Sequence, residues 1–552
     1  MRAFSRLFFA AALIPPLLGL PGCEEDLVAD RAGGTVDVSG ARGTRDEGAH
    51  HSQIGAIAQA PGAARRSARL TPEPERIGQD APDVYLIVID TLRRDSVSAY
   101  GYPRETTPSI DRLAGSGVLF ENAFSTSSWT VPAMYSMITG LYPREHGVDK
   151  GAVGRGGVVG QPVLSEEAVT LTERLKRVGY RTRGVCTNHH LHRKFGFSQG
   201  FDEFVGKGFL KLPFPEMAVE SFRDEDGSDG GAVNEAGPTF YWLHYFDPHF
   251  PYRDNQPWFT EWNESGYSGW EELTFDASRR IYRRRHHLSE SDSIPLADVT
   301  RVHRRARTLA MSHPRDLLRV ASRSGDEIER RYMSFLRTAY DTEVARVDRS
   351  LEKIFGKLGV GDEDLVIIVA DHGEEFGDHG SIGHRWLSSL HDELVRVPLL
   401  LLLPGREHAG ERVRAPVSIV DIAPTVADVL DLDVGRGECS GVSLLEAVEA
   451  PLDMGRVIHG ELEEPAAVVK FRLEWPYKLI RDFGRGEASL YDMEADPGEV
   501  RDLSGRRPRL TAQMEERLGA WMERTAPRFG EISTVPLTAQ ELERLRAMGY
   551  VM

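Results

Sequence analysis

Two apolar stretches of the sequence end in residues that could bind a metal ion. Asp90 follows Val84–Ile89, and Asp371 and His372 follow Leu365–Ala370. Carboxylates suit hard divalent cations, and an imidazole widens the choice toward manganese or zinc. Taken singly, an aspartate at the end of a strand is more often the cap of the next helix. The residue types alone therefore leave a metal site and a pair of helix caps as alternatives.

Buried strands must present these residues. Val84–Ile89 is a continuous apolar run rich in β-branched residues, which is typical of a strand buried on both faces of a mainly parallel sheet. Helical patterns such as 344–358 alternate with further predicted strands, at 180–186, Thr239–Tyr245, Leu365–Ala370 and 397–403. This alternation predicts an α/β fold, in which polar residues after the strands line a binding crevice.

The chain is long enough for one large core and a smaller one, because it has 552 residues of which 41% are hydrophobic. An irregular stretch at 251–331 predicts a substrate-side insertion, although its basic run 279–287 alone equally fits a solvated charged helix. Short strands at 468–472 and 477–481 predict a small C-terminal α+β subdomain over residues 436–552. The formal net charge of -17 argues against nucleic acid as a partner.

The N-terminus resembles an export signal. Arg2 and Arg6 precede an apolar run at 7–20, which is too short to span a bilayer. The run leads into Leu-Pro-Gly-Cys, which resembles a bacterial lipoprotein cleavage site, so residues 1–22 are predicted to be removed and Cys23 to carry lipid. Residues 23–81 are polar and without hydrophobic periodicity, which predicts a flexible tether. We expect an exported protein, lipid-anchored in the cell envelope and facing the periplasm or the exterior, with simple secretion or a retained anchor as alternatives.

Longer motifs follow one another along residues 82–551, among them VYLIVIDTLRRD, TVPAMYSMITGLYPREHG, FDPHFPY, ADHGEEFGDHG, RVPLLLLLPG, YKLI and LYDMEADPGE. Their order is similar to that in the sulfatase family of the alkaline phosphatase superfamily. The resemblance implies a catalytic domain at 82–435, with an alkaline-phosphatase-like, mainly parallel sheet between layers of helices. It also implies one divalent metal ion, calcium, manganese or zinc, held by Asp90, Asp371 and His372.

The same resemblance puts Thr130 where sulfatases have their nucleophile, in the turn before a helix. Sulfatases carry a cysteine or serine there and oxidise it to formylglycine; threonine cannot be converted, so no formylglycine is expected. The family's arginine is replaced by Met134, and its lysine is missing from the stretch 186–189. Superfamily relatives that act on phosphate esters use an unmodified threonine, which a metal activates. The alternative is that Thr130 only caps the helix that begins near Pro132.

Two histidines and an arginine complete the predicted site. His249, in FDPHFPY, matches the family histidine that contacts the transferred group or protonates the leaving oxygen. His384 lies about where sulfatases carry a lysine that contacts the ester, and a histidine there could donate a proton or bind a second metal. Arg385 beside it could compensate for the lost cations by binding substrate. His379 is as readily a turn residue bonded to the backbone as a site residue. A cluster of three further histidines is predicted to lie on the surface, with contact to a metal or to the substrate as the alternative: His189, His190 and His192.

These residues predict a metal-dependent hydrolase of sulfate or phosphate esters, which transfers the group to Thr130 and then to water. The threonine and the missing cations favour phosphate esters over sulfate esters. The substrate is expected to be a small-molecule, glycan or lipid ester. Two alternatives remain at this point, a phospho-head-group transferase and a catalytically silent surface-binding protein.

Overall fold

The computed structural model of the chain describes residues 76–149, 153–155, 158–206, 214–220, 222, 237–253, 255–263, 282–283, 288–289, 294, 327–384, 389–432, 438–464, 467–530 and 532–547. The predicted signal segment, Cys23, most of the tether, most of the insertion and Arg385 lie outside these residues. The chain divides into Met1–Leu70 and Thr71–Met552, and all described residues belong to the second unit. At its start the Ile77 amide donates to the Val178 carbonyl (2.9 Å), so the last residues of the predicted tether pack on the body.

An eight-stranded sheet forms the centre of this unit. Its strand order is β14 (Arg412–Val413), β2 (Val118–Phe120), β13 (Leu399–Leu402), β9 (Leu365–Ala370), β1 (Val84–Ile89), β8 (Thr239–Tyr245), β6 (Arg181–Cys186) and β7 (Glu203–Gly206). All neighbours are parallel except β13, which is antiparallel to both β2 and β9. Ile89 pairs with Tyr245 and Ala370, so β1, β8 and β9 end at the same level. The residues that follow these strands are therefore brought to one edge of the sheet.

Continuous apolar runs form the middle of the sheet, as predicted. Every residue of β1 and β9 is buried, because both faces of the sheet are covered. The predicted strand at 397–403 is divided at Pro398 into β12 (Arg396–Val397) and β13. Proline has no amide hydrogen to donate to a ladder, which accounts for the break. The predicted α/β class with a mainly parallel sheet is confirmed.

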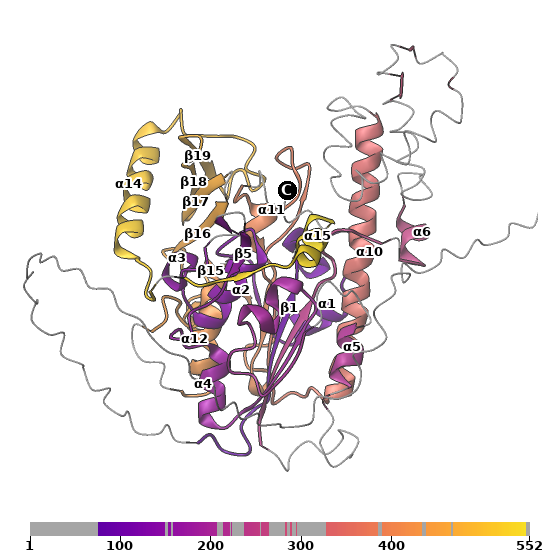
Figure 1. The fold of residues 1–552 in the computed structure, drawn as a ribbon, viewed down its shortest axis with the longest axis vertical. Coiled ribbons are helices and arrows are strands. Elements are labelled where there is room, and N and C mark those ends of the chain that lie inside the picture. Colours follow the sequence, from indigo (N-terminus) through magenta and orange to yellow (C-terminus); the bar gives the residue numbers. More distant parts are fainter. Residues whose placement is uncertain are drawn as a thin grey trace, which may run out of the picture. The chain divides into compact units, whose positions relative to one another are not determined.

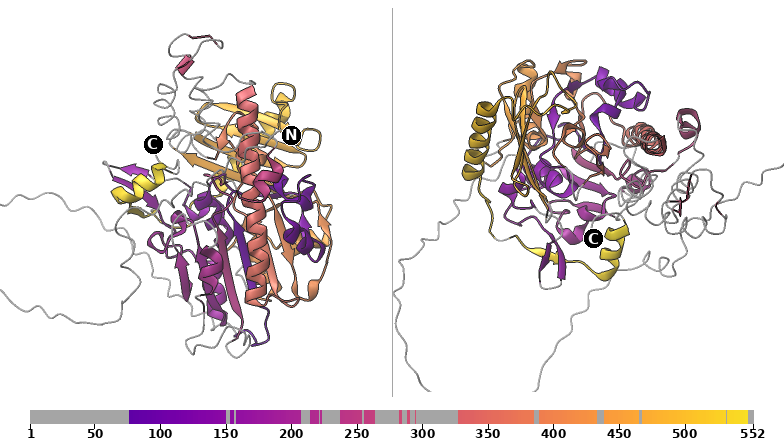
Figure 2. Two further views of the ribbon diagram at one scale, coloured as in Figure 1. Left: turned by 90° about the vertical axis from the view of Figure 1, so that its right-hand side faces the viewer. Right: turned by 90° about the horizontal axis from the view of Figure 1, so that it is seen from above.

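Helices cover both faces of the sheet. On one side lie α1 (Pro108–Gly115), α5 (Phe214–Val219) and the long α10 (Glu327–Leu358), and on the other lie α2 (Thr130–Thr139), α4 (Leu171–Val178) and α12 (Ile422–Val429) (Figure 1). Figure 2 shows α10 in front of the central sheet when the molecule is turned. No helix among the described residues is both long and apolar enough to cross a membrane.

A second, antiparallel sheet follows toward the C-terminus. It consists of β16 (Val457–Glu464), β17 (Ala467–Glu474), β18 (Tyr477–Asp482) and β19 (Glu487–Asp492), and α14 (Pro508–Arg524) packs against it (Figure 2). The predicted strands at 468–472 and 477–481 lie within β17 and β18. After α14 the chain returns to the part that contains the central sheet, where β20 (Thr534–Pro536) pairs with β5 (Val158–Pro162) before α15 (Ala539–Ala547).

Shorter elements connect these layers. They are β3 (Ala123–Phe124), α3 (Pro143–His146), β4 (Val153–Arg155), α6 (Trp258–Trp262), β10 (Glu375–Phe376), β11 (Ile382–Gly383), α11 (Asp392–Val395), β15 (Val417–Ser418) and α13 (Leu444–Glu449). Among them β12, β3 and β15 form a small three-stranded sheet, and β10 and β11 form a hairpin directly after the end of β9.

Candidate active site

The ends of β1 and β9 place three potential ligand side chains together. Asp90 follows β1, and Asp371 and His372 follow β9, with side chains that are 0% exposed. One ligand atom from each residue lies within 4.8 Å of the others. His372 Nε2 is 3.8 Å from Asp90 Oδ1 and 3.6 Å from Asp371 Oδ2. These spacings are wide enough for an ion between the three groups, because metal–ligand bonds to oxygen and nitrogen are about 2.0–2.6 Å long.

Hydrogen bonds orient these groups with their electron pairs facing one another. The Nδ1 hydrogen of His372 is donated to the Gly373 carbonyl (2.9 Å), which leaves Nε2 as an acceptor. Asp371 Oδ1 accepts the amides of Thr91 (3.2 Å) and His372 (2.9 Å). Its other oxygen, Oδ2, is buried and accepts no hydrogen bond within the described part of the chain. A cation would neutralise two buried carboxylates and satisfy this oxygen, so the residues present fit a divalent metal ion.

Two residues that the sequence reasoning missed surround Asp90. Asn188, just after β6, donates from Nδ2 to Asp90 Oδ2 (2.8 Å). His244, inside β8, has Nε2 3.7 Å from the same oxygen. Burial lowers the pKa of His244 to about 4, so its ring is neutral at neutral pH and adds no positive charge. The sequence signal that could have identified His244 is its position within the otherwise apolar run of β8.

Thr130 is the first residue of α2, and its side chain is fully buried at the metal cluster. Its Oγ1 lies 3.2 Å from His372 Nε2. The N-cap of α2 is Trp129, which differs from the alternative in which Thr130 caps the helix. The segment before α2 is fixed to β9, because Ser125 Oγ donates to the Asp371 carbonyl (2.5 Å). The structure therefore brings the predicted nucleophile and the three predicted metal ligands together.

The two predicted acid–base histidines lie next to the cluster. The ring centre of His384 is 4.4 Å from that of His372 and 4.7 Å from that of His249. His249 donates its Nδ1 hydrogen to the Phe250 carbonyl (2.5 Å), and His384 Nδ1 is 2.7 Å from Glu374 Oε1. In each ring the other nitrogen, Nε2, is the one that is not used in these contacts.

Glu374 is a further residue that the sequence reasoning did not single out, although it belongs to the ADHGEEFGDHG motif. It is fully buried, and its second carboxylate oxygen accepts the Tyr252 hydroxyl (2.9 Å). Burial raises the pKa of Glu374 to about 7. A carboxylate on Nδ1 fixes the tautomer and the orientation of the ring, so Glu374 directs Nε2 of His384 away from itself.

The positions where sulfatases carry cations are occupied here by neutral side chains. Met134 is 0% exposed within α2, in the hydrophobic core. In the stretch 186–189 the position of the family's lysine corresponds to Thr187, which is buried and donates its hydroxyl hydrogen to the His244 carbonyl (2.9 Å). Arg385, predicted to replace these cations, lies outside the described residues.

The prediction of a surface position was wrong for His189 and His190, whereas His192 is partly exposed. His189 is 8% exposed and His190 is 2% exposed. His190 Nδ1 is 2.9 Å from Gln161 Oε1 of β5, and His189 Nε2 is 3.7 Å from Glu541 of α15. The returning C-terminal segment covers this loop, which could not be foreseen because the contacts join parts of the chain that are far apart in sequence.

A second histidine and carboxylate group includes His379, in the loop between β10 and β11. His379 Nδ1 is 2.6 Å from Glu393 Oε1, and His379 Nε2 is 3.2 Å from the Glu499 carbonyl. The rings of His379 and His391 are stacked, with centres 3.6 Å apart and planes inclined by 3°. One ligand atom of His379, His391 and Glu393 also lies within 4.8 Å of the others.

Comparison with known proteins agrees with this geometry. The sulfatase family model matches residues 82–432. A Delta 4,5-hexuronate-2-O-sulfatase of Bacteroides thetaiotaomicron is 25% identical, over 77% of this chain and 85% of that protein. A solved structure in complex with its substrate D-glucosamine-2-N,6-O-disulfate has a TM-score of 0.59 at 18% identity, covering 82% of this chain and 100% of that one. The phosphonate monoester hydrolase of Agrobacterium radiobacter has a TM-score of 0.57 at 20% identity, covering 80% and 96%. The chain belongs to the sulfatase family, and it is an ester hydrolase of the alkaline phosphatase superfamily.

Proposed function

We propose that the protein hydrolyses phosphate esters in preference to sulfate esters, with Thr130 as nucleophile and a divalent metal ion held by Asp90, Asp371 and His372. The observation that carries the proposal is the 3.2 Å contact between Thr130 Oγ1 and His372 Nε2. The hydroxyl of the predicted nucleophile therefore lies next to one of the three proposed metal ligands. Bound there, the ion favours the ionised form of a hydroxyl and offsets negative charge on the nonbridging oxygens of the ester.

The chain's own residues supply the remaining steps. Thr130, its proton having passed to water, attacks phosphorus, and the bond from phosphorus to the leaving oxygen breaks. His384 or His249 gives a proton to the leaving oxygen, since both rings lie beside the cluster. Water then attacks the phosphothreonine ester, the bond from phosphorus to Thr130 Oγ1 breaks, and Thr130 takes back from solvent the proton that it gave up. The product is inorganic phosphate from a monoester and a phosphate monoester from a diester. The histidine returns to its protonated form by taking the proton of the attacking water.

The preference for phosphate rests on what occupies the predicted cation positions. Met134 and Thr187 are neutral and buried, so neither can clamp a sulfate group by charge. Residue 130 is a threonine, which excludes the formylglycine on which sulfatases rely. The similar Agrobacterium radiobacter protein is named a phosphonate monoester hydrolase, and a phosphorus-containing substrate in that relative supports a phosphate ester as the substrate here. The sulfated-sugar names of the other relatives favour a glycan ester as the substrate class.

The experiment is hydrolysis of matched aryl sulfate, aryl phosphate monoester and aryl phosphate diester by the full chain, with manganese, zinc or calcium. Thr130→Val keeps the shape of the side chain and removes the hydroxyl, so it is expected to lower kcat by about a thousandfold or more, while Thr130→Ser retains activity. Thr139→Val is the matched control, because Thr139 is a buried threonine at the other end of α2 whose hydroxyl donates to the Tyr135 carbonyl (2.6 Å). Full activity of Thr130→Val, or preference for the aryl sulfate, would contradict the proposal.

We also propose that the protein is exported and carries lipid on Cys23, anchored in the cell envelope and facing the periplasm or the exterior. The apolar run at 7–20 and the Leu-Pro-Gly-Cys sequence that follows it support this. Labelled fatty acid should enter the unaltered chain and fail to enter Cys23→Ser. Equal labelling of the two proteins, or none of either, would count against lipid attachment there.

A further inference from the structure

The turn after β1 contains a residue in an unfavourable backbone conformation. Thr91 has φ of 57°, in the left-handed region, and its side chain is 0% exposed. Side chains branched at Cβ, such as threonine, are rarely found there because Cβ and the backbone crowd one another. Strain of this kind persists only where surrounding contacts hold it in place. The residue directly follows Asp90, one of the proposed metal ligands.

This conformation directs the Thr91 amide at the second metal-ligand loop. The amide donates to Asp371 Oδ1 (3.2 Å), which also accepts the His372 amide (2.9 Å). With Oδ1 engaged by two amides, Oδ2 is the oxygen that faces His372 Nε2, at 3.6 Å. The strained turn therefore joins the loops after β1 and β9 and sets which oxygen of Asp371 is available to an ion.

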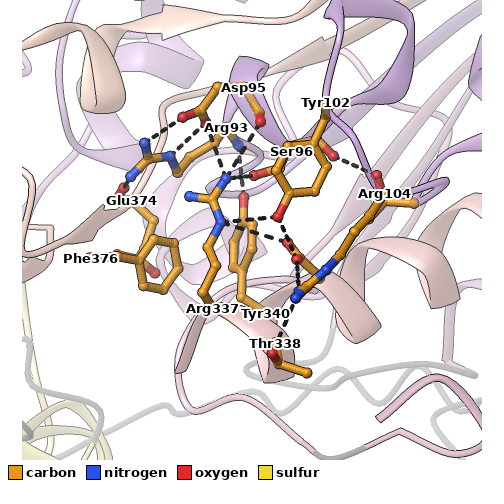
Figure 3. A network of polar contacts seen from close by, with 12 residues as sticks. Arg93, Asp95, Ser96, Tyr102, Arg104, Arg337, Thr338, Tyr340, Glu374 and Phe376 are labelled. Atoms are coloured by element: carbon orange, nitrogen blue, oxygen red, sulfur yellow. Dashed lines mark hydrogen bonds and ion pairs between the residues drawn. The ribbon is translucent and has the colours of Figure 1, made fainter. Parts of the chain in front are cut away.

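Tyr340 of α10 holds the strained turn from behind. Its hydroxyl donates to the Thr91 carbonyl (2.8 Å) and accepts the Arg93 amide (2.8 Å). Its ring is fully buried and packs edge-on against Phe376 and Tyr252, with centres 5.0 and 5.5 Å away. Figure 3 shows Tyr340 reaching the Arg93 turn from the helix that also carries Arg337. One hydroxyl thus bonds the backbone on both sides of Leu92.

Arg93 links the turn after β1 to the loop that follows β9. Its Nη1 donates to the Glu374 carbonyl (2.9 Å) and to Asp378 Oδ2 (2.7 Å), beyond the end of β9. Arg337, one turn before Tyr340, donates to Ser96 Oγ (2.8 Å), as Figure 3 shows. The turn is therefore held at three places, but only the Tyr340 hydroxyl contacts Thr91 itself among these side chains in the described residues.

We propose that Tyr340 is a positioning residue for the metal site: its hydroxyl keeps Thr91 in the left-handed conformation that directs the amide at Asp371, and this sets the affinity for the ion. The inference rests on the proposed function only in taking Asp90, Asp371 and His372 as metal ligands. Without the hydroxyl the Thr91 carbonyl and the Arg93 amide lose a buried partner, and the turn can relax to an ordinary backbone conformation. Relaxation would turn the amide away from Asp371.

The test is calorimetric titration of the metal-free full chain with Mn²⁺. Tyr340→Phe, which keeps the ring and its packing, is expected to raise the dissociation constant about tenfold, since a buried hydrogen bond is lost. Adding Thr91→Gly should bring the constant back to within about threefold of the unaltered chain, because glycine adopts this conformation without strain. Tyr102→Phe is the matched control, since that hydroxyl donates to Asp341 Oδ2 (2.6 Å) in the same network, and its constant should not change.

The outcomes separate this inference from the proposed function. If the unaltered chain binds none of Mn²⁺, Zn²⁺ and Ca²⁺, both fall; if it binds Zn²⁺ or Ca²⁺ but not Mn²⁺, the variants are titrated with that ion. If it binds and Tyr340→Phe binds equally tightly, or if Thr91→Gly fails to restore Tyr340→Phe, this inference alone is overturned. Thr91→Gly by itself keeps the inference testable should Tyr340→Phe not fold: it is expected to bind within about threefold of the unaltered chain. A tenfold loss in that variant would show that the threonine side chain, and not the backbone conformation, sets the affinity.

Discussion

Two groups of histidine and carboxylate side chains lie close enough to share an ion, one after β1 and β9 and the other beside the β10–β11 hairpin. In both, one ligand atom of each member lies within 4.8 Å of the others. In the first, His372 uses Nδ1 on a carbonyl and turns Nε2 toward Asp90 and Asp371. In the second, His379 uses both ring nitrogens, on Glu393 and on the Glu499 carbonyl.

Ring orientation and protonation distinguish the two groups. The electron pair of an imidazole nitrogen lies in the plane of the ring, so parallel rings 3.6 Å apart cannot both direct a pair at one ion. Burial lowers the pKa of His379, but the bond to Glu393 outweighs it and raises the pKa to about 9, so this ring is charged at neutral pH. Burial and the charge of His379 lower the pKa of His391 to about 2. The second group is thus a charged ring stacked on a neutral one, and closeness of ligand atoms alone does not make a metal site.

The largest expected effect tests this distinction directly. Asp371→Asn removes one charge from the first group and should abolish stoichiometric metal binding and lower hydrolysis by about a thousandfold or more. Glu393→Gln removes one charge from the second group and should change neither, because no ion is expected there. Metal content after dialysis and hydrolysis rates measure both. A loss of metal from Glu393→Gln with retention in Asp371→Asn would reverse the assignment of the two groups.

A third histidine–carboxylate pair, His384 with Glu374, gives a prediction of intermediate size for the rate of hydrolysis. His384 contacts Glu374 through Nδ1, as His379 contacts Glu393, but its ring faces the proposed reaction centre. Glu374→Gln keeps the shape and loses the charge that supports a protonated His384. It should lower kcat by about tenfold to a hundredfold for esters with poor leaving groups, and less for activated aryl esters.

Glu375→Gln is the matched control for Glu374→Gln. Glu375 is the adjacent buried glutamate, and its carboxyl group bonds Ser381, whereas it is Glu374 that contacts His384. We expect its kcat to remain within about twofold. If Glu374→Gln slows all leaving groups equally, Glu374 shapes the site without supporting proton transfer.

The sheet and the metal ligands could be predicted because their signals are local. Val84–Ile89 and Leu365–Ala370 are uninterrupted apolar runs, and each is followed at once by an aspartate. Parallel pairing in register then brings the following residues to one edge without further information. The positions of Thr130, His249 and His384 came from the resemblance, because a loop or helix residue has no periodic pattern that places it in space.

The residues that support the site could not be predicted. Tyr340 lies in a 32-residue helix and Asn188 in a loop, and each reaches the site across more than 90 positions of the chain. Their types are common, so only the fold shows that they meet Thr91 and Asp90. The prediction that His189 and His190 lie at the surface failed because α15, which covers this loop, belongs to a segment about 350 residues later in the chain.

The smallest expected effect concerns the stability that the charged ring of the second group provides. The folded pKa of His379, about 9, lies above its ordinary value of 6.5, so protonated His379 stabilises the fold. This contribution is complete below about pH 6.5, is lost as the pH rises through about 9, and amounts to about 3 kcal/mol at most. Glu375 adds a separate loss between about pH 4.5 and 8, because its folded pKa is raised to about 8.

The variant His379→Gln removes the charged ring and with it the charge that lowers the pKa values of Glu375 and His391. Urea unfolding should give the unaltered chain a larger free energy of unfolding near neutral pH, and the difference should shrink as the pH passes about 9. Glu393→Gln should remove the same pH dependence, since the carboxylate is what raises the pKa of His379. A difference that stays constant with pH would mean that the stacked pair is neutral, and the second group would then differ from the first in ring orientation alone.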